Sequence, residues 1–305
     1  MLTILCYHGV TNKKSYGIEN YSQKHIQYKI FREQLKSIKN FSQVISMNDV
    51  VEMYKNGINS KENLVAITFD DGFKNNIEVA APILDDFNFK ATFYITSGLI
   101  GTNKLFWVDQ IENSINHYKK ENLKIDLNGE IFDFQTKTKY KKIQALNSIK
   151  KYCKQAKNSE KNRIVDYVNN LCEGKTFNTN KVSNYEVMNW QDVKKINQEK
   201  NFIIGGHSLR HDLFSKIETE SQLKYDIETS IELIQNKIGC KITHYSYPEG
   251  QSIHFNNKII KILKGNDIIC CPTAIDGIND GSEDLFSLKR IMPNFMGREF
   301  PNFKH

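Results

Sequence analysis

Residues 64–69 of this chain form an apolar run that ends in two adjacent carboxylates, Asp70 and Asp71, and then in Gly72. An uninterrupted run of apolar and β-branched residues predicts a strand buried on both faces, as in a parallel sheet. Glycine gives the backbone the freedom to leave the strand sharply. Asp-Asp-Gly is by itself also an ordinary turn sequence. In parallel α/β proteins, however, ligands bind at the carboxyl ends of strands, so we expect both acids to line a binding site.

The order of strand followed by helix recurs along most of the chain. β-Branched and aromatic residues mark the strands, and apolar residues at helical spacing mark the helices. Strand, helix and strand in succession predict parallel strands joined by crossover helices. The predicted strands are residues 2–7, 64–69, 90–96, 202–206, 242–247, 267–274 and 285–292, and the predicted helices are residues 23–39, 48–57, 75–87, 190–200, 219–238 and 257–264.

Residues 102–187 interrupt this order and are rich in lysine and asparagine. Alternating residues around Asn128-Gly129 predict a β-hairpin over residues 123–134. The flanking helical segments are predicted at residues 106–119, 138–157 and 161–172. We interpret this region as a mainly helical insertion within a single catalytic domain spanning residues 1–305.

Composition narrows the functional classes. With 39% hydrophobic and 25% charged residues, the chain is typical of soluble globular proteins. Its net charge of +7 comes from scattered lysines, which is too diffuse to predict nucleic-acid binding. We find no membrane-spanning run and no signal-peptide pattern, so we expect a cytoplasmic protein without a transmembrane segment. Its six cysteines show no CxxC spacing, which favours free thiols in a reducing compartment.

Three predicted strands end in polar groups of the kind that hydrolytic metal sites use. They end at Asp70-Asp71, at His207 to His211, and at Tyr247-Pro248-Glu249. Two histidines four residues apart can aim at a common point, and a carboxylate from another strand completes a set of two nitrogens and one oxygen. Such a set leaves coordination positions free for water and substrate. Together the motifs therefore predict a catalytic divalent metal site.

These motifs resemble those of the polysaccharide deacetylase family, the NodB-homology domain of carbohydrate esterase family 4. The similarity rests on Thr68-Phe69-Asp70-Asp71-Gly72, on His207-Ser208-x-x-His211, and on the later Tyr-Pro-x-Gly. The opening sequence Leu5-Cys6-Tyr7-His8-Gly9-Val10 also resembles family members that begin with the first barrel strand. The resemblance implies a distorted (β/α) barrel of about seven strands and a metal-dependent N-deacetylase acting on amino sugars.

The resemblance also implies roles for individual residues. Asp71, His207 and His211 would bind the metal, and Asp70 would be the catalytic base. The backbone N–H of Glu249 would stabilise the oxyanion together with the metal. We assign substrate contacts to His8, Tyr247 and Pro248. The ligand types indicate zinc, and nickel or cobalt would fit the same ligands.

The sequence departs from the family pattern at three places. Family members often carry an arginine where this chain has Ser246, and we propose that Arg290 replaces it in orienting the base. The late leucine-x-histidine motif that supplies the general acid is absent, and our candidates are first His254 and then His8. Glu249 stands where an aromatic residue is frequent, which predicts a more polar pocket.

We thus expect a carbohydrate N-deacetylase in the synthesis of surface polysaccharide or glycoconjugate, acting on an amino sugar that is part of a nucleotide- or lipid-linked precursor. Two alternatives use the same scaffold. One is a deformylase or a cyclic-amide hydrolase with the same metal and base. The other is a catalytically silent glycan-binding barrel that has lost its general acid.

Overall fold

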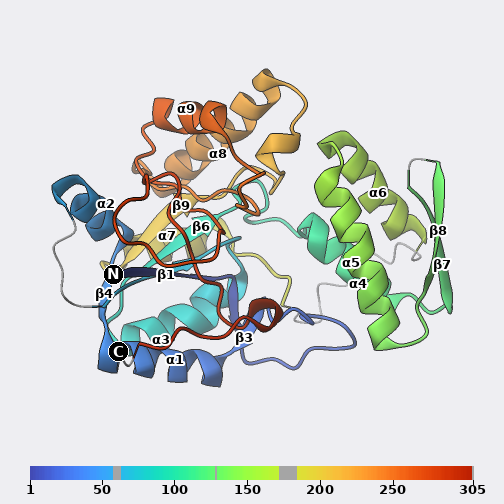
Figure 1. Ribbon diagram of the computed structural model, residues 1–305, viewed down its shortest axis with the longest axis horizontal. Helices are drawn as coiled ribbons and strands as arrows, with labels where there is room; N and C mark the ends of the chain where they lie inside the picture. The colour runs from blue at the N-terminus through green and yellow to red at the C-terminus, as the bar shows by residue number, and fades with distance from the viewer. Residues whose placement is uncertain (58–62, 128, 172–183, 304–305) are drawn as a thin grey trace.

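A parallel sheet forms the centre of the molecule. The computed structural model describes residues 1–57, 63–127, 129–171 and 184–303. The strands lie in the order β1-β5-β6-β9, and β4 pairs with the start of β5, all in parallel (Figure 1). The strands are β1 (Leu2–Tyr7), β4 (Gln43–Ile45), β5 (Leu64–Phe69), β6 (Ala91–Ile95) and β9 (Phe202–Gly206). The predicted strands at residues 2–7, 64–69 and 202–206 are confirmed.

Beyond β9, single bridges replace continuous strands. Tyr245 bridges to Gly206, His244 to Cys270, and Ile291 to Leu5 of β1. The regular strands predicted at residues 242–247, 267–274 and 285–292 are therefore wrong. Pro248 ends the first segment and Pro272 interrupts the second, and proline has no N–H to extend a ladder. The result is a distorted α/β barrel, which no continuous ladder closes among the residues that the structure describes.

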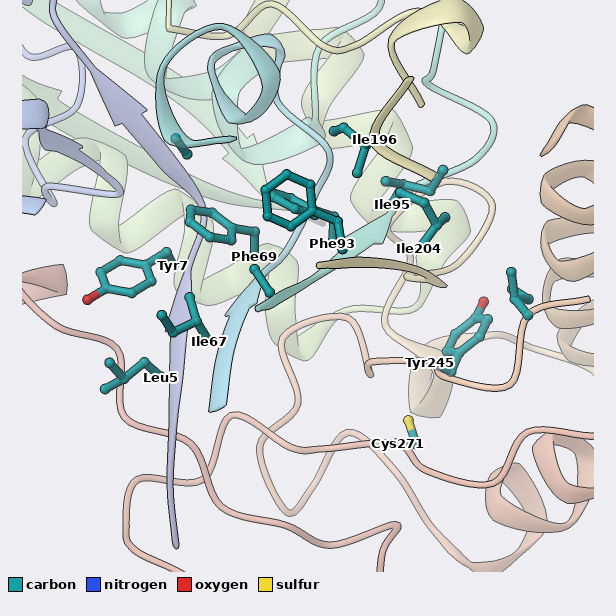
Figure 2. Packing of buried hydrophobic residues seen from close by; sticks show 14 of the residues in the cluster. Leu5, Tyr7, Ile67, Phe69, Phe93, Ile95, Ile196, Ile204, Tyr245 and Cys271 are labelled. Atoms are coloured by element: carbon teal, nitrogen blue, oxygen red, sulfur yellow. The ribbon is translucent and has the colours of Figure 1, made fainter. Parts of the chain in front are cut away.

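Helices cover the sheet. Figure 1 shows α1 and α3 on one side of the strands and α8 and α9 on the other. Side chains at alternate strand positions, among them Tyr7, Phe69 and Phe93, are buried in one large apolar cluster (Figure 2). The helices are α1 (Tyr28–Phe41), α2 (Met47–Asn56), a π-helical turn (Asn76–Ala80) leading into α3 (Ala81–Asp86), α7 (Trp190–Gln198), α8 (Glu220–Ile238) and α9 (Asn257–Gly265).

Two predicted helix starts are wrong. The segment before α1 is extended, because β3 (His25–Gln27) pairs with β2 (Gly9–Thr11). The start of α2 lies earlier than Asn48, since Ser46 and Asp49 form a reciprocal capping box. The predicted glycine stop is confirmed at Gly239, which has a φ of 81° after α8.

The insertion has an apolar core of its own. Its helices and hairpin bury a second cluster that includes Ile111, Leu146 and Val168. It lies to one side of the sheet (Figure 1). Its elements are α4 (Trp107–His117), the antiparallel β7 (Asn122–Leu127) and β8 (Glu130–Gln135), α5 (Lys139–Gln155) and α6 (Asn158–Leu171). The predicted hairpin is confirmed in its described residues, whereas Asn128 and the predicted helix end at Cys172 lie outside them.

Among the described residues, no helix has the length and apolarity that crossing a bilayer requires. Five of the six cysteines lie in the described chain, and each is a free thiol, four of them buried.

Candidate metal and catalytic site

The turn after β5 separates the two neighbouring acids. Asp71 has a φ of 79° and Gly72 a φ of 90°, so two consecutive residues adopt positive φ. This conformation is unfavourable for a residue with a side chain, by roughly 1 kcal/mol or more. Asp71 is held in it because its carbonyl accepts the N–H of Thr96 at 3.1 Å. The reversal directs the Asp70 and Asp71 carboxylates to different partners.

A second strained loop carries the histidines after β9. Ser208 and His211 have φ values of 70° and 60°. The His211 N–H donates to the Ser208 hydroxyl at 2.7 Å, and the Ser208 N–H donates to the Tyr245 hydroxyl at 2.7 Å. The Leu209 N–H donates to the buried carboxylate of Asp226 on α8 at 3.0 Å. These bonds fix the loop so that both imidazoles point toward Asp71.

Asp71, His207 and His211 form a buried cluster. Oδ1 of Asp71 lies 3.5 Å from Nε2 of His207 and 3.4 Å from Nε2 of His211. Nδ1 of His207 donates to the Ser246 carbonyl at 2.9 Å, which leaves the lone pair on Nε2. Oδ1 of Asp71 is buried without a hydrogen-bond partner among the described residues. Burial raises the pKa of Asp71 well above its usual value and lowers the pKa of both histidines.

This donor set fits a divalent cation. The three side chains offer one oxygen and two nitrogens, all within 4.8 Å of one another. A buried carboxylate oxygen that faces the Nε2 lone pair of His207 is electrostatically unfavourable unless a cation lies between them. One carboxylate and two imidazoles are ligands typical of catalytic zinc.

Asp70 has a different environment. Nη1 of Arg290 donates to Oδ1 at 2.8 Å and Nη2 donates to Oδ2 at 2.7 Å. The Ser246 hydroxyl also donates to Oδ2, at 3.3 Å. Burial opposes ionisation of Asp70, but the charge of Arg290 outweighs it and holds the pKa of this carboxyl well below its usual range. Asp70 is therefore ionised beside the cluster of Asp71, His207 and His211.

Arg290 lies in the barrel interior and is 0% exposed. Its Nε donates to the Thr273 carbonyl at 2.5 Å, and its Nη2 donates to the Ser246 hydroxyl at 2.9 Å. The guanidinium also lies 5.9 Å from the centre of the Tyr94 ring. These contacts fix the plane of the guanidinium that pairs with Asp70.

The third motif forms a tight loop at Glu249. Glu249 has a φ of 60°, and its carboxylate accepts a hydrogen bond from Lys154 of α5 at 2.5 Å. Within the described residues, no acceptor pairs with the Glu249 N–H. Pro248 is buried next to it. The substrate contact expected of the Tyr247 side chain is not supported, because its ring is 1% exposed and its hydroxyl donates to the Phe286 carbonyl at 3.1 Å.

The two candidate acids lie in different surroundings. The His8 ring stacks on Phe295 at 5.8 Å and interacts electrostatically with Asp70 and His207. Burial lowers its pKa to about 3. His254 is 4% exposed, and its Nδ1 accepts the N–H of Gln251 at 3.2 Å. Its largest electrostatic interactions are with Glu249 and Lys154, whereas Asp70 is among the largest for His8.

Sequence reasoning missed two residues that contact the site. Lys154 belongs to a lysine-rich helix in which nothing distinguishes it from its neighbours. Ser246 was noted only as the position of a missing arginine, yet its hydroxyl links Arg290 to Asp70 and its carbonyl orients His207.

The fold and the site together define a class of protein, namely a distorted α/β barrel with a carboxylate pair and two histidines at the carboxyl ends of its strands. The sequence model of the family described as Polysaccharide deacetylase matches residues 57–268 of this chain. The chain belongs to this family. Comparison with curated protein sequences finds no match.

Several solved structures share this fold, and two of the three described here are named as deacetylases. The structure of IcaB from Ammonifex degensii is 15% identical and has a TM-score of 0.60, with 96% of this chain and 91% of that chain covered. Streptococcus pyogenes deacetylase PplD, in complex with acetate, is 15% identical with a TM-score of 0.59 over 96% and 92% of the two chains. A de-N-acetylase from Aggregatibacter actinomycetemcomitans is 17% identical with a TM-score of 0.57 over 95% and 93%. These similarities confirm the fold.

Proposed function

We propose that this protein is a metal-dependent carbohydrate N-deacetylase, which hydrolyses the acetamide of an amino sugar to acetate and a free amine. One observation carries the proposal. The adjacent acids have separate partners, because Asp71 faces two imidazoles while Asp70 is paired with Arg290. Amide hydrolysis needs such a division, with one group to hold a metal and another to accept a proton.

Asp71, His207 and His211 would hold the metal, and zinc is the ion that their donor atoms favour. When bound, the metal would polarise the acetyl carbonyl and lower the pKa of a water molecule. All three ligand side chains are buried, which strengthens their electrostatic attraction to a cation.

Asp70 is the base in this proposal. Its two hydrogen bonds from Arg290 fix the carboxylate plane and keep it ionised at neutral pH. It would accept the proton of the attacking water. Arg290 acts through Asp70 and is a positioning residue.

The tetrahedral intermediate carries an oxyanion, which needs a fixed donor. The Glu249 N–H is suited to this role because its backbone is held in a tight turn and the N–H has no acceptor among the described residues. A backbone donor can act whichever side chain the residue carries. The leaving amine requires a proton, and we favour His8 over His254 as its source because His8 interacts with Asp70. Burial keeps His8 neutral before the reaction, so it would first take up the proton that Asp70 accepts from the attacking water and then donate it to the amine.

We further propose a nucleotide- or lipid-linked amino sugar as substrate, in the synthesis of surface polysaccharide or glycoconjugate. The third motif carries a charged side chain, because Glu249 is paired with Lys154. A polar pocket of this kind suits a precursor that carries charged groups beside the sugar.

The test combines metal analysis with acetate release from acetylated amino sugars, free and nucleotide-linked, by wild type and Asp70→Asn. We expect one divalent ion per chain in both proteins and acetate release only by wild type. A panel of formylated and cyclic amides accompanies the acetylated substrates. Turnover confined to that panel would assign the protein to deformylases or cyclic-amide hydrolases, and metal binding with no turnover of any substrate would favour a glycan-binding barrel.

A further inference from the structure

One charged contact connects the insertion to the third motif. Nζ of Lys154, on α5, lies 2.5 Å from Oε2 of Glu249, and the two side chains are 36% and 18% exposed. Burial alone would raise the pKa of Glu249, but the charge of Lys154 lowers it to about 2. The pair is thus ionised and partly shielded from solvent, where an ion pair is stronger than on an open surface.

Glu249 needs external support for its backbone conformation. Its φ of 60° lies in the left-handed region, which non-glycine residues adopt only when surrounding contacts require it. On the far side, the loop is fixed because the Gly250 carbonyl accepts the Ala274 N–H at 2.9 Å. A Cβ at Gly250 would lie 2.6 Å from the Ala274 nitrogen, so the backbones are in close contact there. On the side that faces the insertion, the hydrogen bond from Lys154 supports the Glu249 side chain.

The position of α5 does not depend on Lys154. Leu146, Ile149 and Cys153 of α5 are buried in the core of the insertion. The next helix, α6, contributes the buried Lys161, whose ammonium pairs with Asp212 beside the histidine loop. The insertion is therefore attached to the barrel near the site through a second contact, and α5 can act as a fixed support for the third motif.

We propose that Lys154 is a positioning residue of the active site, which holds Glu249 in the left-handed conformation that aims its N–H at the oxyanion. The inference rests on the proposed deacetylase function and extends it, because it makes the insertion a functional part of the site. Lys154 touches neither the substrate nor the reacting atoms. It acts through the side chain and backbone of Glu249.

The kinetic test compares Lys154→Met with Lys151→Met, an exposed lysine of the same helix, in acetate release. An oxyanion donor acts mainly in the transition state, so Lys154→Met should lower kcat about tenfold with KM within twofold of wild type. Lys154→Arg should restore most of the rate, and Lys151→Met should match wild type. Equal metal content in all variants would exclude collapse of the metal site. Unchanged kcat in Lys154→Met would overturn the proposal.

A double variant tests whether Lys154 acts through Glu249. If it does, Lys154→Met combined with Glu249→Gln should be no slower than the slower single variant. Multiplied effects would show independent roles and would overturn the proposal.

A readout without turnover separates this inference from the proposed function. The Gly250 N–H donates to the Pro248 carbonyl at 2.7 Å, so its hydrogen exchange reports on the loop. Exchange should be about tenfold faster in Lys154→Met than in wild type and unchanged in Lys151→Met. Should wild type release no acetate while this exchange difference is observed, the deacetylase function fails and the support of the loop by Lys154 stands. Identical exchange in wild type and Lys154→Met would refute that support whatever the activity.

Discussion

Arg290 and Asp70 form a bidentate, fully buried ion pair although 220 positions separate them in the sequence. Asp70 directly follows β5, whereas Arg290 lies in the segment that leads back to β1 through the bridge between Ile291 and Leu5. Closure of the barrel therefore brings the guanidinium to the base. The pair couples the stability of the barrel interior to the catalytic apparatus.

Replacing Arg290 should destabilise the fold as well as reduce activity. Arg290→Met leaves the Asp70 carboxylate buried without a counter-ion, and loss of one partner of a buried pair costs about 3–5 kcal/mol. Urea denaturation followed by circular dichroism measures this loss in the free energy of unfolding. The double variant Arg290→Met with Asp70→Asn should recover much of the stability, because no unpaired charge remains. A single variant as stable as wild type would show that the pair is not needed to neutralise Asp70.

Metal binding should raise the thermal stability of the protein. A ligand that binds only the folded state at 100 times its Kd stabilises that state by about 2.7 kcal/mol. Zinc added to metal-stripped protein should therefore raise Tm, and a chelator should reverse the rise. His211→Ala should lose this response, whereas His117→Ala, which changes a histidine on α4 outside the cluster, should keep it. A zinc response that survives His211→Ala would place the metal elsewhere.

Local sequence patterns were sufficient for β1, β5, β6 and β9 of the sheet and for the insertion hairpin, whereas the short strand β4 was not predicted. Five of the six residues 64–69 are apolar, so a buried strand follows directly from their burial preference. The same reasoning failed for residues 242–247, where alternating polar residues such as His244 and Ser246 are buried because they contact partners distant in sequence. A pattern of hydrophobicity cannot reveal such partners.

In the candidate site, too, some residues could be predicted from the local sequence and others could not. Asp71, His207 and His211 could be brought together from the sequence, since all three follow predicted parallel strands. Tyr247 belongs to the third motif, yet its side chain lies in the apolar core and its hydroxyl donates to the Phe286 carbonyl. A motif does not reveal which side of the backbone a residue faces. Lys154 could not be found at all, since its role depends on how the insertion packs against the barrel.

Variants of the two candidate acids should separate their roles. General acid catalysis is worth about 10²–10⁴-fold, so His8→Ala should lower kcat for acetate release by at least about 100-fold. His254→Ala should stay within about threefold of wild type. Phe295→Leu serves as a matched control, because it removes the ring stacked on His8 but leaves the imidazole. The reverse ranking of the two histidine variants would assign the acid to His254.

Asp226 should make the stability of the protein depend on pH. This carboxyl is 0% exposed, and burial, with a smaller contribution from Asp212, raises its pKa to about 6. The bond from the Leu209 N–H and the charges of Arg210 and Lys161 oppose the rise. The unfolded chain has a pKa near 3.9, so the folded state binds this proton more tightly. The contribution of Asp226 is therefore most favourable below about pH 4 and is lost as pH rises through about 6, a change of about 3 kcal/mol for a shift of about two pKa units.

Asp226→Asn removes this titration but keeps an oxygen that can accept the Leu209 N–H. The variant should be more stable than wild type at pH 8, by up to about 3 kcal/mol, and should lose that advantage at pH 4, where the wild-type carboxyl is protonated. Chemical denaturation at pH 4, 6 and 8 measures the difference. Asp86→Asn, at a surface position 54% exposed and paired with Arg32, should change stability by less than about 1 kcal/mol at every pH. If Asp226→Asn is instead less stable than wild type at pH 8, the ionised carboxylate stabilises the histidine loop, and its charge offsets the cost of burial.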